Sequence, residues 1–206
     1  MRLNVSSTRM ELARLKKRLV VAERGHKLLK DKQDELMRRF MEIIEETRSL
    51  RVKIENNLSA VLRRFVHINS YMGAERVFEA LVLPSVRVDI DVKVVSVMNV
   101  KVPEITWVRE GAFRCYGFAG TSGELDLYLM ELDGIFGDMI RLAQNEKCAQ
   151  LLADELVKTR RRVNALEYVL IPDIRETIRY IAIKLDEMER ASLSRLMRVK
   201  DIVRAK

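Results

Sequence analysis

Residues that break helices and shape loops are scarce in this sequence of 206 residues, which contains 8 Gly and 3 Pro. Aromatic residues are also few, at 6% of the chain, whereas charged residues make up 33%. A compact domain of several packed layers needs many turns and a larger supply of bulky side chains. The composition, in which Leu, Arg, Glu, Lys and Ala dominate, is instead typical of long helices.

Cysteine is nearly missing, since Cys115 and Cys148 are the only two and lie apart in the sequence. This pattern predicts two reduced thiols with no disulfide and no role in metal binding. Long apolar runs are missing as well, because no window approaches the ~20 apolar residues of a membrane span. Charged residues from Arg2 onward interrupt any signal-peptide pattern. We therefore expect a soluble, intracellular protein.

The chain has a formal net charge of +8, and the basic excess lies at its two ends. Residues 1–30 hold nine basic side chains against two acidic ones, and residues 184–206 hold seven against four. The middle of the chain carries a slight negative excess. Basic ends indicate an acidic partner without identifying its kind.

Apolar residues in the first third of the chain recur mainly in alternating steps of three and four. This spacing predicts a coiled-coil seam along one long helix. The seam residues are Leu12, Leu15, Leu19, Ala22, Leu29, Leu36, Phe40, Ile43, Leu50, Ile54, Leu58, Val61, Phe65, Ile68 and Met72. His26, Gln33 and Thr47 interrupt the stripe, and we expect His26 to set the register of the seam.

A second helical seam follows Gly120 and predicts the partner of the first. Its residues are Val163, Leu166, Leu170, Ile174, Ile178, Ile181, Leu185 and Met188. Thr121 and Glu124 fit a capping box, with Ser122 as the competing cap. Pro172 should bend this helix at a local cost of about 3 kcal/mol. Because each apolar stripe needs a partner, we expect the helices to pair antiparallel with both termini at one end.

Between the two helical segments the pattern changes to strict alternation of apolar and polar residues. Val86 to Val94 reads as a half-buried strand. Val100 to Trp107 reads as a second strand, which Pro103 confines to an edge or a bulge. Pro84 is expected to stop the preceding helix. The sequence thus predicts a small β-hairpin or sheet.

We therefore predict a mainly α protein, a long antiparallel two-helix coiled coil with a small central β-hairpin insert. It should consist of an N-terminal long helix over residues 1–73, an insert over 74–120 and a C-terminal long helix over 121–206, all in one coiled-coil domain.

The sequence contains no recognisable active site. Gly117, Gly120 and Gly123 lack the lysine and the spacing of a phosphate-binding loop. The only histidines, His26 and His67, lie far apart on the first helix, and a metal-binding role is not expected. We predict no catalytic residue, no cofactor and no metal site, and hence a protein that is not an enzyme.

A basic cluster, Arg160 to Arg162 after Lys158, admits two interpretations. It is either a solvated helix face or a contact to an acidic partner protein in a complex. Nucleic-acid binding is disfavoured, because no aromatic residues for base stacking are interleaved and no helix-turn-helix or zinc pattern is present.

Several runs resemble one family when they are taken in chain order. Arg9–Leu12 and Arg24–Leu36 closely resemble the first helix of the D subunit of V-type (A/V-type) rotary ATPases, and Val100–Pro103 looks like its central motif. Lys158–Tyr168, with Ile171 and Pro172 after it, is similar to its C-terminal helix signature. The resemblance extends over nearly the whole chain.

Two positions depart from the family pattern. Ser7 stands where relatives often have proline, although Ser7 or Thr8 can cap the helix as well. Asn99 stands where a small residue is common, and asparagine tolerates the left-handed conformation of a turn.

The resemblance implies a central rotor shaft that couples ATP hydrolysis or synthesis to rotation of a membrane ion-translocating ring. Its paired terminal ends would insert into a catalytic hexamer of A and B subunits, the F subunit would bind alongside, and the C subunit would hold the opposite end. The implied location is cytoplasmic, with membrane association only through the complex. The candidate contacts to the hexamer pore are Arg9, Arg14, Lys17, Arg18, Arg195, Arg198 and Lys200. The candidate contacts to the F subunit or a regulatory partner are Val88, Ile90, Val92, Arg160 and Arg161.

Two other functions stay open on the residues alone. A free-standing coiled-coil adaptor would bind acidic partners or anionic surfaces through its basic ends, in a manner that salt weakens. A helical hairpin that binds nucleic acid would show the same salt dependence on DNA. The rotor function predicts neither, and the sequence specifies neither the coupled ion nor the direction of coupling.

Overall fold

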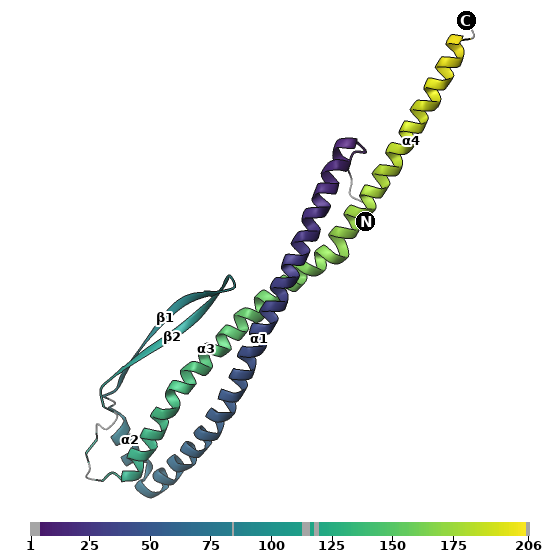
Figure 1. The fold of residues 1–206 in the computed structure, drawn as a ribbon. Helices are drawn as coiled ribbons and strands as arrows, with labels where there is room; N and C mark the ends of the chain where they lie inside the picture. Colours follow the sequence, from purple (N-terminus) through teal and green to yellow (C-terminus); the bar gives the residue numbers. More distant parts are fainter. Residues whose placement is uncertain (1–4, 84, 113–115, 118–119, 205–206) are drawn as a thin grey trace. The chain divides into compact units, whose positions relative to one another are not determined.

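The computed structural model describes residues 5–83, 85–112, 116–117 and 120–204. Two long helical segments pack together, with a two-stranded antiparallel hairpin between them in the chain (Figure 1). The elements are α1 (Arg9–Met72), α2 (Ala74–Leu81), β1 (Arg87–Val97), β2 (Val100–Glu110), α3 (Gly123–Ala165), a π turn (Leu166–Leu170) and α4 (Ile171–Arg204). The predicted fold class is confirmed.

These elements form two compact units. The terminal unit combines Met1–Glu35 with Leu156–Lys206, and the central unit is Leu36–Glu155. Helix α1 therefore contributes its first part to the terminal unit and the remainder to the central unit.

Helix α1 has a clear start and a clear end. The Thr8 hydroxyl accepts a hydrogen bond from the Glu11 backbone N–H at 3.2 Å, which satisfies one of the free donors of the first turn. The helix ends at Met72, because Gly73 adopts φ +86° and ψ 140°, a non-helical backbone conformation that favours glycine. The short helix α2 that follows was not predicted. Pro84, which we expected to stop the helix, lies outside the described residues.

The predicted seam forms the core of the central unit. Ile54, Val61 and Ile68 of α1 are buried in one cluster with Leu125 and Leu129 of α3. Tyr128 joins this cluster and stacks in a tilted geometry on Phe65, with ring centroids 5.1 Å apart. Leu36 and Leu125 have 0% exposure, so the apolar stripe forms a close-packed interior.

In the terminal unit the start of α1 packs antiparallel to α4. Leu15 and Ala22 are buried on α1, and Ile174 and Ile181 are buried on α4. Ion pairs join the same helices, from the Arg9 guanidinium to Glu189 and from Arg175 to Glu23, where Nη2 and Oε1 are 2.7 Å apart. This pairing agrees with the predicted antiparallel arrangement.

The hairpin has a regular register from Arg87 opposite Glu110 to Val97 opposite Val100. Its two-residue turn, Met98 and Asn99, has φ values of 53° and 67°, the pair of positive values that a type I′ turn requires. Pro103 lies opposite Val94 without disturbing the register, because both strands of a lone hairpin are edges.

The start of α3 differs from the prediction. The Ser122 hydroxyl accepts the hydrogen bond from the Glu124 backbone N–H at 3.3 Å. The Thr121 hydroxyl instead donates to the Gly117 carbonyl at 2.8 Å. Ser122, the competing cap, therefore caps the helix, and the Thr121–Glu124 capping box is wrong.

Pro172 produces a distortion of a specific kind. The helix widens to a π turn over Leu166–Leu170, and Pro172 is the second residue of the α-helix that follows. In the first turn of a helix, a proline's missing N–H leaves little unsatisfied. The proline, which we expected to bend the helix, is therefore accommodated by a wider turn just before it.

Candidate interaction surfaces

The predicted basic contacts near the N-terminus lie on the first turns of α1. The Arg9 guanidinium pairs with Glu189, and Arg14 Nη1 lies 3.2 Å from Glu11 Oε1 on its own helix. Lys17 and Arg18 are exposed. These four side chains thus lie along one well-packed helix pair, where Arg9 is already engaged in an ion pair with α4.

The predicted C-terminal contacts lie on a part of α4 that extends past the start of α1. Helix α1 begins level with Glu189, whereas α4 continues to Arg204 (Figure 1). Every residue from Arg190 to Arg204 is exposed, including Arg195, Arg198 and Lys200. We had expected both termini to lie together at one end, but α4 extends past the start of α1 and presents a bare terminal segment, Arg190–Arg204.

The bare segment carries apolar side chains that the sequence interpretation missed. They are Leu193, Leu196, Met197, Val199, Ile202 and Val203, each 56–68% exposed. The signal was present in the sequence, because the helical pattern after Gly120 is longer than the one before Met72 and leaves its last residues without a partner.

The hairpin is held against α3 by strand β2. Trp107 meets Phe136 edge to face, with ring centroids 5.5 Å apart, and Gly137 leaves room for its indole ring. The Ile105 backbone N–H donates to Gln144 Oε1 at 2.9 Å. The hairpin runs alongside α3 in Figure 1 with β1 as the outer strand.

The outer strand β1 exposes two of the three predicted apolar contacts and half-buries Val88. By the register, Val88, Ile90 and Val92 share a face with Ile105 and Trp107. Ile90 is 55% exposed and Val92 is 54% exposed. Strand β1 thus offers an open backbone edge together with a row of apolar side chains, the arrangement that accepts a partner strand or surface.

A small apolar cleft of about 120 Å³ continues this surface, lined by Val86, Val88, Arg109, Leu132, Asp133 and Phe136. The Arg109 guanidinium pairs with Asp133 at the cleft. The cleft is large enough to hold an apolar side chain of a partner.

The predicted contacts Arg160 and Arg161 belong to the terminal unit, whereas Val88, Ile90 and Val92 belong to the central unit. Both arginines are exposed on α3, next to the buried Thr159. The two groups are therefore separate candidate surfaces.

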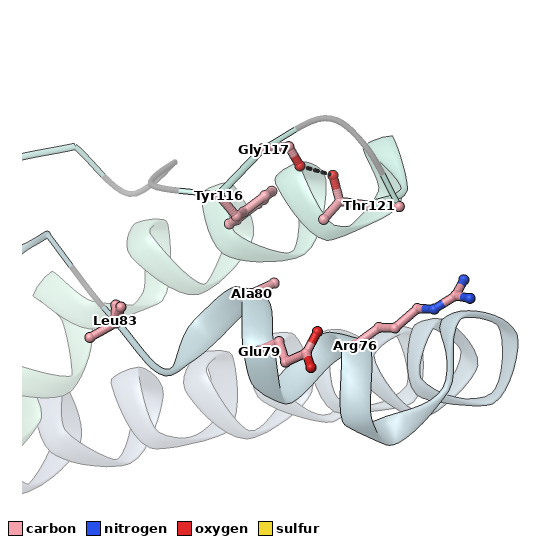
Figure 2. A pocket seen from close by; sticks show the side chains of 8 residues that line it. Arg76, Glu79, Ala80, Leu83, Tyr116, Gly117 and Thr121 are labelled. Carbon is pink, nitrogen blue, oxygen red and sulfur yellow. Dashed lines mark hydrogen bonds between the residues drawn. The ribbon is translucent and has the colours of Figure 1, made fainter.

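A wider pocket of about 380 Å³ lies beside α2, and Figure 2 shows its lining. Arg76 and Glu79 supply its charges, and Tyr116 and Thr121 supply its hydroxyl groups. Thr121 donates its hydrogen to the Gly117 carbonyl. A nucleophile activated by an adjacent base is not found among these lining residues.

Two titratable groups of the core have altered pKa values. Burial raises the pKa of the Cys148 thiol and of the Tyr128 phenol. A thiol with a raised pKa is a poor nucleophile at neutral pH. Cys115 lies outside the described residues. Within the described ranges, no three His, Cys, Asp or Glu side chains come together as a metal site would require.

The two histidines face carboxylates across the helix pairs. His26 Nε2 lies 3.4 Å from Glu167 Oε2, and His67 Nδ1 lies 3.5 Å from Glu124 Oε2. His26 is at the seam, as predicted, and each contact joins two helices within one unit.

Comparison with known proteins places these surfaces in context. Residues 11–201 match the family model for the D subunit of ATP synthase. The V-type ATP synthase D subunit of Thermoanaerobacter sp. (strain X514) is 49% identical over 203 residues, which cover 98% of this chain and 97% of that protein. Its counterpart in Clostridium novyi (strain NT) is 48% identical over 207 residues, covering 98% and 96%. No helix of the described chain has a segment long and apolar enough to cross a membrane.

Proposed function

This chain belongs to the family of ATP synthase D subunits, and from that membership we propose that it is the central stalk, or rotor axle, of a V-type ATPase or ATP synthase. It couples ATP hydrolysis or synthesis in a catalytic hexamer of A and B subunits to rotation of an ion-translocating ring. The chain itself supplies no catalytic group. It lies on the cytoplasmic side, peripheral to the membrane, and is attached to it only through the complex.

The bare terminal segment of α4, called the bare end below, is the observation that best supports this proposal. Its exposed residues include six apolar side chains between Leu193 and Val203. At about 100° per residue, these side chains spread over more than half of the helix circumference. A single flat partner would leave part of that apolar surface in water, whereas a pore formed by several proteins covers it from all sides. The basic residues among them favour a pore with acidic side chains.

A charge reversal in the bare end tests this contact. We expect Arg195→Glu, Arg198→Glu and Lys200→Glu together to lower ATP-driven ion transport of the reassembled complex several-fold. Thermal unfolding of the free chain should barely change, because all three side chains are exposed. ATP hydrolysis, ion transport and melting temperature are the measurements.

The matched control reverses three exposed charges on α1, Arg24→Glu, Lys27→Glu and Lys30→Glu. It changes the net charge by the same amount outside the bare end. Ion transport that is equally affected by both triple variants, or by neither, would contradict a specific pore contact.

We propose that the face of β1 with Val88, Ile90 and Val92 binds the F subunit, and that the apolar cleft beside Val88 receives one of its side chains. The open strand edge and the exposed apolar row support this assignment. Arg160 and Arg161 are proposed as a separate contact to an acidic surface of a neighbouring protein in the complex. The C subunit is proposed to hold the end of the paired helices near Gly73.

Binding of the purified F subunit tests the β1 face. Ile90→Asp with Val92→Asp should abolish capture of the F subunit in a pull-down assay. Val95→Asp with Val108→Asp places the same two charges on the opposite face of the hairpin, where Val95 and Val108 are also exposed. Normal capture by the first variant would contradict the assignment, and loss of capture by both would show that the hairpin itself had unfolded.

A further inference from the structure

The second long helical segment contains a π turn, Leu166–Leu170, that is not stabilised by buried side chains of its own. The Ile171 backbone N–H bonds to the Leu166 carbonyl, five residues back, instead of the usual four. None of the five residues of the turn is buried, and Tyr168 and Val169 are 71% and 57% exposed. Such turns are rare and occur often at functional positions.

The apolar seam has one extra residue at the same place. Leu166, Leu170, Ile174 and Ile178 follow one another in three consecutive steps of four, although a regular seam alternates three and four. The π turn takes up that residue, so the side chains on both sides of it face α1. Val163 before the turn and Ile171 and Ile174 after it are buried accordingly.

Pro172 prevents the helix from closing into a regular α-helix. A proline ring in a helix interior clashes with the carbonyl four residues back, here that of Tyr168, and it has no N–H to donate. The wider π turn avoids this clash. The extra residue and the proline together keep the turn open.

The part of α1 that faces the π turn, around Gly25 and His26, also has a low helix stability. Gly25 is the only glycine of that helix, and a Cβ at this position would meet nothing within 4 Å. Glycine is therefore not needed there for space, and it weakens the helix. The neighbouring His26 Nε2 is buried without a hydrogen bond and has only the 3.4 Å approach to Glu167 Oε2, on the π turn.

We infer that Gly25–His26 and residues 166–172 form a flexible joint in the terminal unit, a conformational device that lets α4 change its direction relative to the end of α3. The weak His26–Glu167 contact holds the joint in the observed geometry. Buried seam residues on both sides of the joint confine the movement to Gly25–His26 and residues 166–172. The joint stands on its own observations, and only its use, to let the axle end yield elastically under load, rests on the proposed function.

Hydrogen exchange of the full chain tests the joint. We expect the amides of residues 166–171 to exchange at least about tenfold faster than those of residues 174–181 in the same helix. A stiffened variant lacks Val169 and has Pro172→Ala and Gly25→Ala. The deletion leaves Val163, Leu166, Ile171 and Ile174 in steps of three, four and three, as a regular seam requires. Its amides in this region should exchange about tenfold more slowly than in the original chain.

Gly134→Ala is the matched control, because a Cβ at Gly134 in the central unit also meets nothing within 4 Å. It should leave exchange of residues 166–171 unchanged. If the deletion disturbs folding, the pair Gly25→Ala and Pro172→Ala, without the deletion, serves as the second variant and should slow the same amides.

Equal protection of residues 166–171 and 174–181, or unchanged exchange in the stiffened variants, would overturn the joint. The mechanical use is measured separately, as the angular fluctuation of a stalled complex, which should narrow in the stiffened variant. A complex that does not rotate at all would contradict the proposed function and leave the exchange result standing.

Discussion

Two single residues of the core show how burial shifts the pKa of a side chain. Cys148 is 8% exposed and Tyr128 is 9% exposed, and burial raises the pKa of both groups. The Cys148 Sγ lies 3.7 Å from the Pro103 carbonyl, so this thiol also touches the hairpin. Both groups are held in their neutral forms by the folded state.

Stability should therefore fall at alkaline pH. The folded pKa of each group lies above the unfolded one, so the stabilisation is complete below about pH 8.5 and is lost as pH rises. Urea denaturation at pH 7.5 and pH 10 measures this fall. Cys148→Ala combined with Tyr128→Phe should reduce it, and a fall of the same size in that variant would assign the pH dependence to other groups.

One glycine at the base of the hairpin is required by its surroundings. Gly111 has a φ of +97°, and a Cβ there would lie 2.1 Å from the Ser85 backbone carbonyl oxygen. Ser85 also donates its hydroxyl to the Ala112 carbonyl at 2.6 Å. Any larger residue at position 111 would force the two ends of the hairpin apart.

At the scale of elements, an aromatic contact helps to hold the hairpin against α3. Trp107 is the only tryptophan of the chain, so its fluorescence reports directly on the packing of β2 against α3. An ideal Cβ at Gly137 would lie 3.4 Å from the Trp107 ring, whereas one at Gly134 would meet nothing within 4 Å.

Gly137→Leu should therefore displace the hairpin. We expect a red shift of the Trp107 emission, stronger quenching by acrylamide and a loss of about 1–3 kcal/mol in the free energy of unfolding from overpacking. Gly134→Leu, one turn earlier in the same helix, should leave the emission unchanged. An identical spectrum for both variants would mean that Trp107 does not rest on Gly137.

The elements also show where sequence interpretation succeeds. The alternation from Val86 predicted a strand, and the seam residues predicted the buried sides of the helices, because both depend on the period of apolar residues. Ser122 displaced the predicted cap at Thr121, since two neighbouring hydroxyl groups compete and only the geometry of the loop decides between them. The short helix α2 was missed because its eight residues are too few to show a clear helical period.

At the scale of the whole chain, the paired helices end before α4 does. Thr177 and Ile181 are buried in the terminal unit, whereas nothing from Arg190 to Arg204 is buried. Folding and the proposed coupling thus depend on different parts of the same helix.

Truncation after Glu189 should separate the effect on folding from the effect on coupling. We expect the free energy of unfolding to change by less than about 1 kcal/mol, because the removed side chains make no buried contact. Rotational coupling in the reassembled complex should be lost under the proposed function. Truncation after Ile174, which removes Thr177 and Ile181, should instead lower the melting temperature strongly. Retained coupling in the chain truncated after Glu189 would contradict a role for the bare end.

The sequence by itself determined the fold class, the helix that starts near Thr8, the hairpin and the family, because these depend on periodicity and on local motifs. Only the tertiary structure decided that β1 is the outer strand, that α4 continues past the partner helix, and that Pro172 is accommodated by a π turn. The physical reason is that periodicity fixes which side of an element is buried but not the level at which two elements meet. That level is set by pairs such as Arg9 with Glu189 and Trp107 with Phe136, whose partners are far apart in the chain.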